Sequence, residues 1–260
     1  MALHFKLKSA YLNEKANPNM TLAMIAEISR LDDQTLIWIN QYMTRWPLLD
    51  KSIAWVLTAN IIKFVPMLAA GCGLWFAKTL KQASNRRILI ESLLASIAAL
   101  AIGRTLALML PFRDRPFVRP ELHFVTTLKP VLRSWSSFPS DHAVLAFALA
   151  ASLFRISPKV GMWALFHATV IICLPRLYFG LHHPTDLIAG AFIGILTISM
   201  FSRSHVFNPV TNYLLRIENK YPGAFYAISF FVLYNIGEMF VSFRFVANYV
   251  FHALELMILP

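Results

Sequence analysis

The chain has 260 residues, of which 57% are hydrophobic and 14% are charged, and its mean hydropathy is +0.57. This composition excludes an ordinary soluble domain and indicates a protein of the lipid bilayer. The net charge of +11 does not indicate a nucleic-acid partner, because the basic residues flank apolar stretches and leave no basic surface interleaved with aromatic residues.

The first expected element is an amphipathic helix. Between residues 20 and 47, apolar side chains such as Ile28 and Ile37 alternate with charged ones such as Glu27 and Arg45. This pattern is typical of a helix that lies in the membrane interface, and we expect it to break near Asp32-Asp33. We therefore assign residues 1–50 to an N-terminal interfacial segment.

The rest of the chain predicts an all-α fold, a polytopic membrane helix bundle of about six transmembrane helices. A spanning helix needs about 20 apolar residues to cross the hydrocarbon layer. Apolar stretches of suitable length or slightly shorter occur at 53–77, 88–109, 141–156, 160–178, 186–202 and 224–250. We expect residues 51–205 to form the membrane core and residues 206–260 to form a C-terminal transmembrane region.

Alternating spans place two polar connections, 110–139 and 179–185, on the same side of the membrane. The opposite side receives a set of lysines and arginines in short loops: Lys78, Lys81, Arg86, Arg87, Arg155, Lys159, Arg203, Arg216 and Lys220. Because short cytoplasmic loops are enriched in these residues, we expect the 179–185 side to be extracytoplasmic. The predicted location is the cell membrane, with several crossings.

The 179–185 connection contains chemistry that a loop does not need for folding. His182 and Asp186 are four residues apart with Pro184 between them, and proline favours a helix start at this point. A carboxylate one helical turn from an imidazole can fix its tautomer and leave the other ring nitrogen free to attack phosphorus.

A second group of polar residues stands at the start of the 141–156 span. Ser140 is a favourable N-cap, and a helix N-terminus presents free N–H groups to a phosphate. His142 beside it can protonate a leaving oxygen, while the guanidinium groups of Arg115 and Arg176 match phosphate oxygens.

Taken singly, these residues have simpler explanations. A histidine at a membrane boundary is more often only interfacial, and an arginine beside a span is usually an anchor that reaches the headgroups. Their combination on one predicted face is far more specific, and it predicts a site that holds and cleaves a phosphate ester.

These residues resemble the signature of the type 2 phosphatidic acid phosphatase superfamily. Its third motif, serine-arginine followed by a spaced histidine and aspartate, is similar to the run from Arg176 to Asp186, with Pro175 in place of the serine. Its second motif, proline-serine-glycine-histidine, is similar to 139–142, with Asp141 in place of the glycine. The similarity covers roughly residues 25–205 and implies that residues 51–205 are the catalytic core.

The first motif of the superfamily is matched only in part. Arg115-Pro116 is present, but Leu108 stands where the motif has a lysine. Arg104, inside the 88–109 span, is the nearest basic residue upstream, and a charge inside a span by default suggests function. We expect Arg104 to supply the missing cation, although it could instead pair with Glu91 or reach the headgroups.

The resemblance implies a role for each residue. His182 would be the nucleophile that forms a phosphohistidine, Asp186 its orienting partner and His142 the general acid. The substrate-binding set would be Arg115, Ser140, Asp141, Arg176 and Arg104. We expect Asp141 to face a basic residue or water rather than phosphate. No metal and no other cofactor is expected, since no acidic cluster in the sequence is arranged for a metal.

The runs 139–142, 113–117 and 183–186 look like those of the bacitracin-resistance type of undecaprenyl diphosphate phosphatase. This resemblance implies hydrolysis of that lipid to its monophosphate. A broader phosphatase for phosphatidate or phosphatidylglycerophosphate, and a lipid phosphotransferase, are alternatives within the same class. A non-enzymatic alternative is a lipid-phosphate transporter or binding subunit, although binding alone does not require a general acid. The expected partners are a membrane lipid phosphate and the bilayer.

Overall fold

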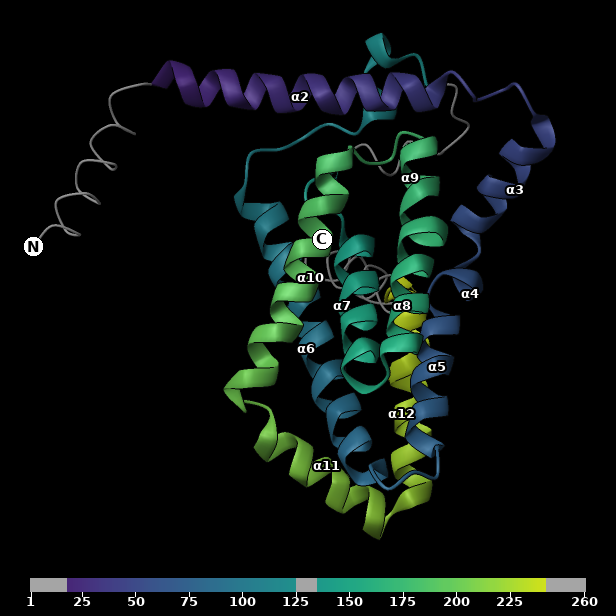
Figure 1. The fold of residues 1–260 in the computed structure, drawn as a ribbon, viewed down its shortest axis with the longest axis vertical. Helices are drawn as coiled ribbons and strands as arrows, with labels where there is room; N and C mark the ends of the chain where they lie inside the picture. Colours follow the sequence, from purple (N-terminus) through teal and green to yellow (C-terminus); the bar gives the residue numbers. More distant parts are fainter. Residues whose placement is uncertain (1–17, 125–134, 242–260) are drawn as a thin grey trace, which may run out of the picture.

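The computed structural model describes residues 18–124 and 135–241, which form helices and short turns and contain no strand within these ranges. The helices run mostly along one direction and form an elongated bundle (Figure 1). The predicted fold class, an all-α membrane helix bundle, is confirmed.

Two helices in contact form the centre of the bundle. They are α7 (Asp141–Ile156) and α10 (Pro184–Ser204), and α6 (Gln82–Met109) packs beside both. A Cβ added at Gly194 would lie 2.4 Å from the carbonyl oxygen of Val144, so only glycine allows this approach of the two backbones. Close approach through small residues is a common way for helices to associate in membranes.

A third long segment runs from Pro158 to Tyr178 as α8 (Pro158–His167), the π-helical turn η4 (Ala168–Cys173) and α9 (Leu174–Tyr178). Pro175 lacks an N–H and cannot continue the α-helical hydrogen bonds, and the wider turn directly precedes it. Together with α6 and α10, this segment is long and apolar enough to cross a membrane.

The predicted span 53–77 is wrong in its continuity. The structure divides it into α3 (Pro47–Thr58), α4 (Asn60–Lys63) and α5 (Val65–Phe76). The backbone is extended at Ala59, and the Lys63 ammonium donates to the carbonyl oxygen of Leu57 at 3.0 Å. This side-chain bond satisfies a helix-terminal carbonyl that a continuous helix would have satisfied with its own backbone.

The C-terminal region contains one helix that the sequence did not predict. The amphipathic α11 (Asn208–Lys220) is joined to the rest by an ion pair of 2.7 Å between Arg86 and Glu218. It leads into the apolar α12 (Pro222–Gly237), which begins the span predicted at 224–250. The end of that predicted span lies outside the described residues.

The N-terminal helix α2 (Pro18–Asn40) lies across one end of the bundle (Figure 1). Its apolar side chains Met24, Ile28 and Trp38 are exposed, as expected of a helix at a membrane interface. The predicted break near Asp32-Asp33 is wrong, because the helix continues through both residues. Their carboxylates bond to arginines of the 110–124 segment instead of capping a new helix.

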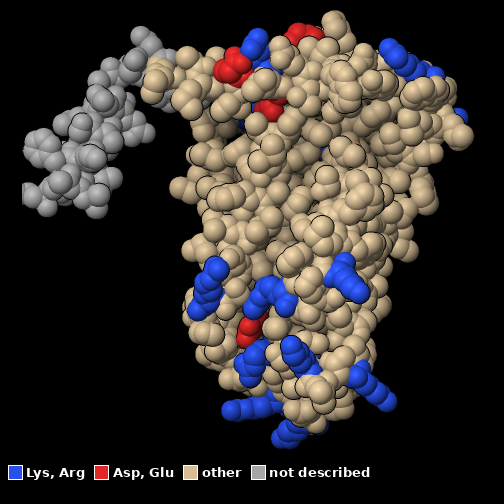
Figure 2. Space-filling model, in the orientation of Figure 1, with Lys and Arg blue, Asp and Glu red and all other residues tan. Residues whose placement is uncertain are grey.

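Charged side chains gather at the two ends of the molecule. Figure 2 shows lysines and arginines around the end where α11 lies, and a broad band without charge between the two ends on the face drawn. An apolar band between charged ends is typical of a membrane-spanning protein.

Candidate functional site

A short turn between α9 and α10 holds the central residue of the candidate site. The turn needs Gly180, whose φ of +61° is unfavourable for other residues. Its carbonyl oxygen accepts a hydrogen bond of 2.9 Å from the backbone N–H of Phe117, in the turn η1 (Pro116–Val118). The turn and the segment that carries Arg115 are therefore tied together by backbone.

His182 lies in this turn with 5% of its surface exposed. Its Nδ1 atom is 2.8 Å from the carbonyl oxygen of Ser137. Because a carbonyl can only accept, this contact requires the proton on Nδ1 and leaves a lone pair on Nε2. That Nε2 atom is 3.3 Å from the Arg115 guanidinium, which also donates to the carbonyl oxygen of Leu181 at 2.9 Å.

The Asp186 carboxylate is fully buried beneath the turn. One of its oxygens is 3.6 Å from His182 Nδ1, farther away than the Ser137 carbonyl. The same oxygen accepts a hydrogen bond of 2.8 Å from the backbone N–H of His183, so it caps α10. The other oxygen accepts from the Arg113 guanidinium at 2.6 Å. The structure thus places Asp186 close to His182 and bonds it more tightly to its other neighbours.

Arg113 links this carboxylate to the N-terminal helix. Its second guanidinium nitrogen donates to the buried carboxylate of Asp32 at 2.7 Å. The same carboxylate accepts from the backbone N–H of Thr185 at 3.1 Å and from the Thr185 hydroxyl. We call Asp32, Arg113, Thr185 and Asp186 the clasp, since they join α2 to the first turn of α10.

The start of α7 faces the same region. Ser140 is buried, caps the helix by accepting from the backbone N–H of Ala143, and donates its own N–H to the carbonyl oxygen of Asp186 at 3.2 Å. His142 follows in the first turn, with its ring centroid 6.0 Å from that of Phe64. The predicted N-cap and the predicted start of α10 near Pro184 are both present.

Arg176 lies on α9 with only 2% of its surface exposed. Its guanidinium donates to the carbonyl oxygen of Ile172 at 2.5 Å, and the described residues include no carboxylate within 4.0 Å of it. The cations whose charge acts on the His142 ring are Arg176, Lys63 and Arg115. The His142 ring therefore lies within electrostatic range of three cations.

Arg104 and Asp141 form an ion pair of 3.0 Å at the edge of this region. Arg104 also lies over the Trp135 ring, 3.7 Å from its centroid. The expectation that Asp141 turns toward a basic residue is consistent with this pair, whereas Glu91 pairs with Arg87 rather than with Arg104. Leu108, at the position of the motif lysine, is 78% exposed.

The protonation of His182 follows from its surroundings. Burial lowers the pKa of His182 to about 4, and the positive charges of Arg115 and Arg176 act in the same direction against the opposing effect of Asp186. At neutral pH the imidazole is uncharged, so Nε2 offers a lone pair.

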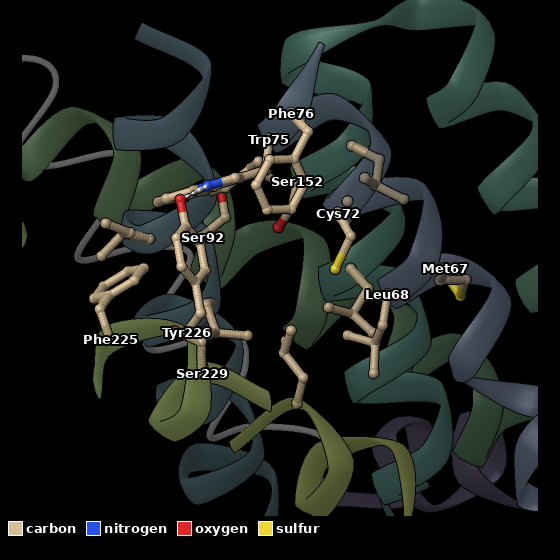
Figure 3. A pocket seen from close by; sticks show the side chains of 17 residues that line it. Met67, Leu68, Cys72, Trp75, Phe76, Ser92, Ser152, Phe225, Tyr226 and Ser229 are labelled. Atoms are coloured by element: carbon tan, nitrogen blue, oxygen red, sulfur yellow. Dashed lines mark hydrogen bonds between the residues drawn. The ribbon is translucent and has the colours of Figure 1, made fainter. Parts of the chain in front are cut away.

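An apolar cavity of about 150 Å³ lies elsewhere in the bundle, between α5, α6, α7 and α12. In Figure 3 the rings of Trp75 and Phe225 and the Cys72 side chain point toward it, and Trp75 donates to the Tyr226 hydroxyl at 3.1 Å. No histidine, lysine, arginine or carboxylate lines this cavity, so it lacks the groups that the sequence predicts for binding a phosphate.

Sequence comparison agrees with the geometry. Residues 88–209, which carry all of the site from Arg104 to Asp186, match the family described as the PAP2 superfamily. This segment is a PAP2 domain. Residues 18–87 and 210–241, including the clasp residue Asp32 on α2, lie outside it.

Two curated relatives are each 28% identical to the chain. One is the undecaprenyl-diphosphatase BcrC of Bacillus subtilis (strain 168), for which the match covers 65% of this chain and 82% of the relative. The other is the bacitracin transport permease protein BcrC of Bacillus licheniformis, for which it covers 47% of this chain and 57% of the relative.

Among solved structures, the chain is similar to a transmembrane PAP2 type phosphatidylglycerolphosphate phosphatase from Bacillus subtilis. The two share 20% sequence identity with a TM-score of 0.47, and the match covers 77% of this chain and 93% of that one.

Several residues of the site were not found from the sequence. The Ser137 carbonyl is a backbone group, which no side-chain motif can reveal. Asp32 and Arg113 are about 80 residues apart in sequence, and nothing local pairs them. Lys63 did have a signal, because it is a charge within a predicted span.

Proposed function

We propose that the protein is a membrane lipid phosphatase that hydrolyses undecaprenyl diphosphate to undecaprenyl phosphate and inorganic phosphate. The observation that carries the proposal is the placement of the His182 Nε2 lone pair against the Arg115 guanidinium, with Nδ1 fixed by a backbone carbonyl. A neutral imidazole held in one tautomer beside a phosphate-binding cation is suited to attack phosphorus.

In the proposed first step, the Nε2 lone pair of His182 attacks the terminal phosphorus. The bond between that phosphorus and the bridging oxygen breaks. His142, which holds its extra proton once the anionic substrate offsets the nearby cations, donates this proton to the bridging oxygen, which leaves with the lipid monophosphate. Arg115, Arg176 and the N-terminus of α7 at Ser140 offset the charge on the phosphoryl oxygens.

In the proposed second step, water attacks the phosphohistidine. His142, now neutral, takes a proton from the water, the P–N bond breaks, and inorganic phosphate leaves with His182 restored. Asp186 is placed to stabilise the positive imidazole ring that exists before this bond breaks, since its carboxylate is 3.6 Å from Nδ1. Asp141 positions Arg104 through their ion pair.

The proposed reaction needs no metal. The described residues contain no group of three histidine, cysteine, aspartate or glutamate side chains that could hold one. The charge of the phosphate is balanced by arginines instead.

The choice of undecaprenyl diphosphate is supported by the name of the Bacillus subtilis relative. We further propose that the site faces the extracytoplasmic side of the cell membrane, because the lysines and arginines of the short loops gather at the other end (Figure 2). Undecaprenyl diphosphate with its head group at this surface would present phosphate to the turn that holds His182 and keep its hydrocarbon chain in the bilayer.

A second candidate is non-enzymatic, and the name of the Bacillus licheniformis relative, a transport permease protein, favours it. This candidate predicts that the protein binds lipid phosphate without turnover. It does not account for a second histidine, His142, beside the anion site.

The test is release of inorganic phosphate by the purified protein from undecaprenyl diphosphate in the presence of a chelator. We expect turnover by the wild type, none by His182→Ala, and normal turnover by the control His205→Asn, since His205 is exposed outside the site in the left-handed conformation that asparagine tolerates. With substrate labelled in its terminal phosphate, the wild type should form an acid-labile, alkali-stable protein adduct that His182→Ala lacks.

Strict dependence on added divalent metal would contradict the proposed mechanism. Binding of the lipid without phosphate release would support the transport candidate. Faster release from phosphatidate than from the polyprenyl diphosphate would move the assignment to a broader lipid phosphatase, and phosphate transfer to an added acceptor lipid would move it to a phosphotransferase.

A further inference from the structure

Lys63 is a buried lysine that the proposed mechanism does not yet use. It ends the short helix α4, and only 4% of its surface is exposed. Its backbone carbonyl accepts a hydrogen bond of 2.9 Å from His167 Nε2, which fixes α4 against the end of α8. The position of the ammonium group is therefore set by packing from several elements.

The ammonium of Lys63 is poorly compensated for a buried charge. Of its three N–H groups, one donates to the Leu57 carbonyl at 3.0 Å, and the described residues offer no carboxylate within 4.0 Å. Glu238 attracts it from farther away and is itself bonded to Asn60 at 2.8 Å. An uncompensated charge inside a membrane protein is costly and by default marks a functional position.

The surroundings of Lys63 carry further positive charge. Arg176, also buried and without a carboxylate in contact among the described residues, repels it. Both cations act on the His142 ring, and Phe64, the residue after Lys63, has its ring next to that imidazole. A phosphate anion bound between the two cations would offset this repulsion, because it attracts both of them.

We propose that the Lys63 ammonium is a further substrate-binding group of this site and pairs with a phosphate oxygen next to His142. The ligand class is a phosphate monoanion or dianion, either the head of the lipid substrate or the inorganic phosphate product. The cation comes from a helix outside the PAP2 domain, whereas Leu108, at the expected lysine position, points outward. The identity of the lipid rests on the proposed function, whereas the binding of an anion rests on the burial and the contacts of Lys63.

The experiment measures binding of inorganic phosphate to the full chain in detergent by calorimetry. Lys63→Gln removes the charge and keeps an N–H donor, one atom shorter than in lysine, that faces the Leu57 carbonyl. We expect its phosphate affinity to fall by roughly tenfold to a hundredfold, as for loss of a charge-assisted hydrogen bond, with little change in thermal unfolding. Lys63→Arg should restore part of the affinity. Lys51→Gln, an exposed lysine of α3, is the matched control and should bind as the wild type does.

A second measurement needs no variant. Saturating inorganic phosphate should slow reductive methylation of Lys63 in the wild type about tenfold or more, while Lys51 reacts at an unchanged rate. Unchanged affinity in Lys63→Gln, or an unchanged methylation rate at Lys63 if that variant fails to fold, would overturn the proposal.

The two proposals can fail separately. If the wild type releases phosphate from the lipid but Lys63→Gln binds phosphate normally, only the role of Lys63 is refuted. If the wild type binds phosphate through Lys63 yet never turns over, the phosphatase function is refuted and the anion site remains.

Discussion

The contact between α7 and α10 makes one glycine decisive for stability. A Cβ at Gly194 would lie 2.4 Å from the Val144 carbonyl oxygen and 2.9 Å from the backbone nitrogen of Ala148, whereas ordinary van der Waals contact begins at 3.4 Å. Both atoms belong to a helix backbone and cannot rotate away, so the helices must separate by about 1 Å. Such a gap forfeits roughly a quarter to a half of each dispersion contact along the interface. We expect Gly194→Ala to lower the free energy of unfolding by about 3 kcal/mol, the upper part of the usual range for overpacking.

The same substitution at Gly73 is a matched control. Gly73 lies in α5, and a Cβ there would meet nothing within 4 Å. Because alanine favours a helix over glycine by about 1 kcal/mol, Gly73→Ala should leave stability unchanged or raise it.

Thermal unfolding in detergent, followed by circular dichroism, separates the two variants. About 3 kcal/mol corresponds to a fall in Tm of roughly 6–12 °C for a chain of this size. Phosphate release should fall as well, because Ser140 and Asp186 start the two helices that separate. If Gly194→Ala melted with the wild type, the reasoning from backbone contact would be refuted.

Three other substitutions test the surroundings of the site. Asp32→Asn should lower turnover by roughly a hundredfold with a smaller change in KM, because it breaks the buried ion pair to Arg113 and the turn shifts. Asp33→Asn breaks a more exposed ion pair and should change turnover little, so equal effects of the two variants would contradict this reasoning. Arg104→Ala should cut phosphate release strongly and leave thermal unfolding intact, and near-normal release would remove Arg104 from the site. In the folded protein the pKa of His182 is lowered to about 4, so between pH 6.5 and 4 the unfolded chain takes up a proton that the folded chain does not. As the pH falls through this range, the free energy of unfolding should decrease more for the wild type than for His182→Asn. Equal decreases for the two proteins would count against a buried neutral imidazole.

Much of the bundle could be predicted from local sequence signals. The start of α7 follows from Ser140 as a cap, and the start of α10 follows from Pro184, because both act on the backbone beside them. The apolar stretches at 88–109 and 160–178 appear as helices with ends within six residues of those expected.

The failures arise where distant groups override local preference. Asp32-Asp33 has the composition of a helix break, but α2 continues because Asp32 has partners in Arg113 and Thr185. The stretch 53–77 is apolar enough for one helix, yet it breaks at Ala59, where a side chain rather than the backbone satisfies the carbonyl of Leu57. Periodicity along one segment carries no information about such partners.

The clasp also bears on how the PAP2 domain depends on the rest of the chain. Asp32 on α2 lies outside residues 88–209, yet it is bonded to the first turn of α10 and, through Arg113, to the Asp186 carboxylate beneath the turn that holds His182. A fragment cut at the family boundaries would keep both histidines of the site and lose this bonded support. The segment recognised by homology is thus shorter than the segment that has to fold for the site to exist. Relatives that share the motifs but differ in their first helices would hold the same turn by other means, so their catalytic rates need not follow the conservation of the motifs.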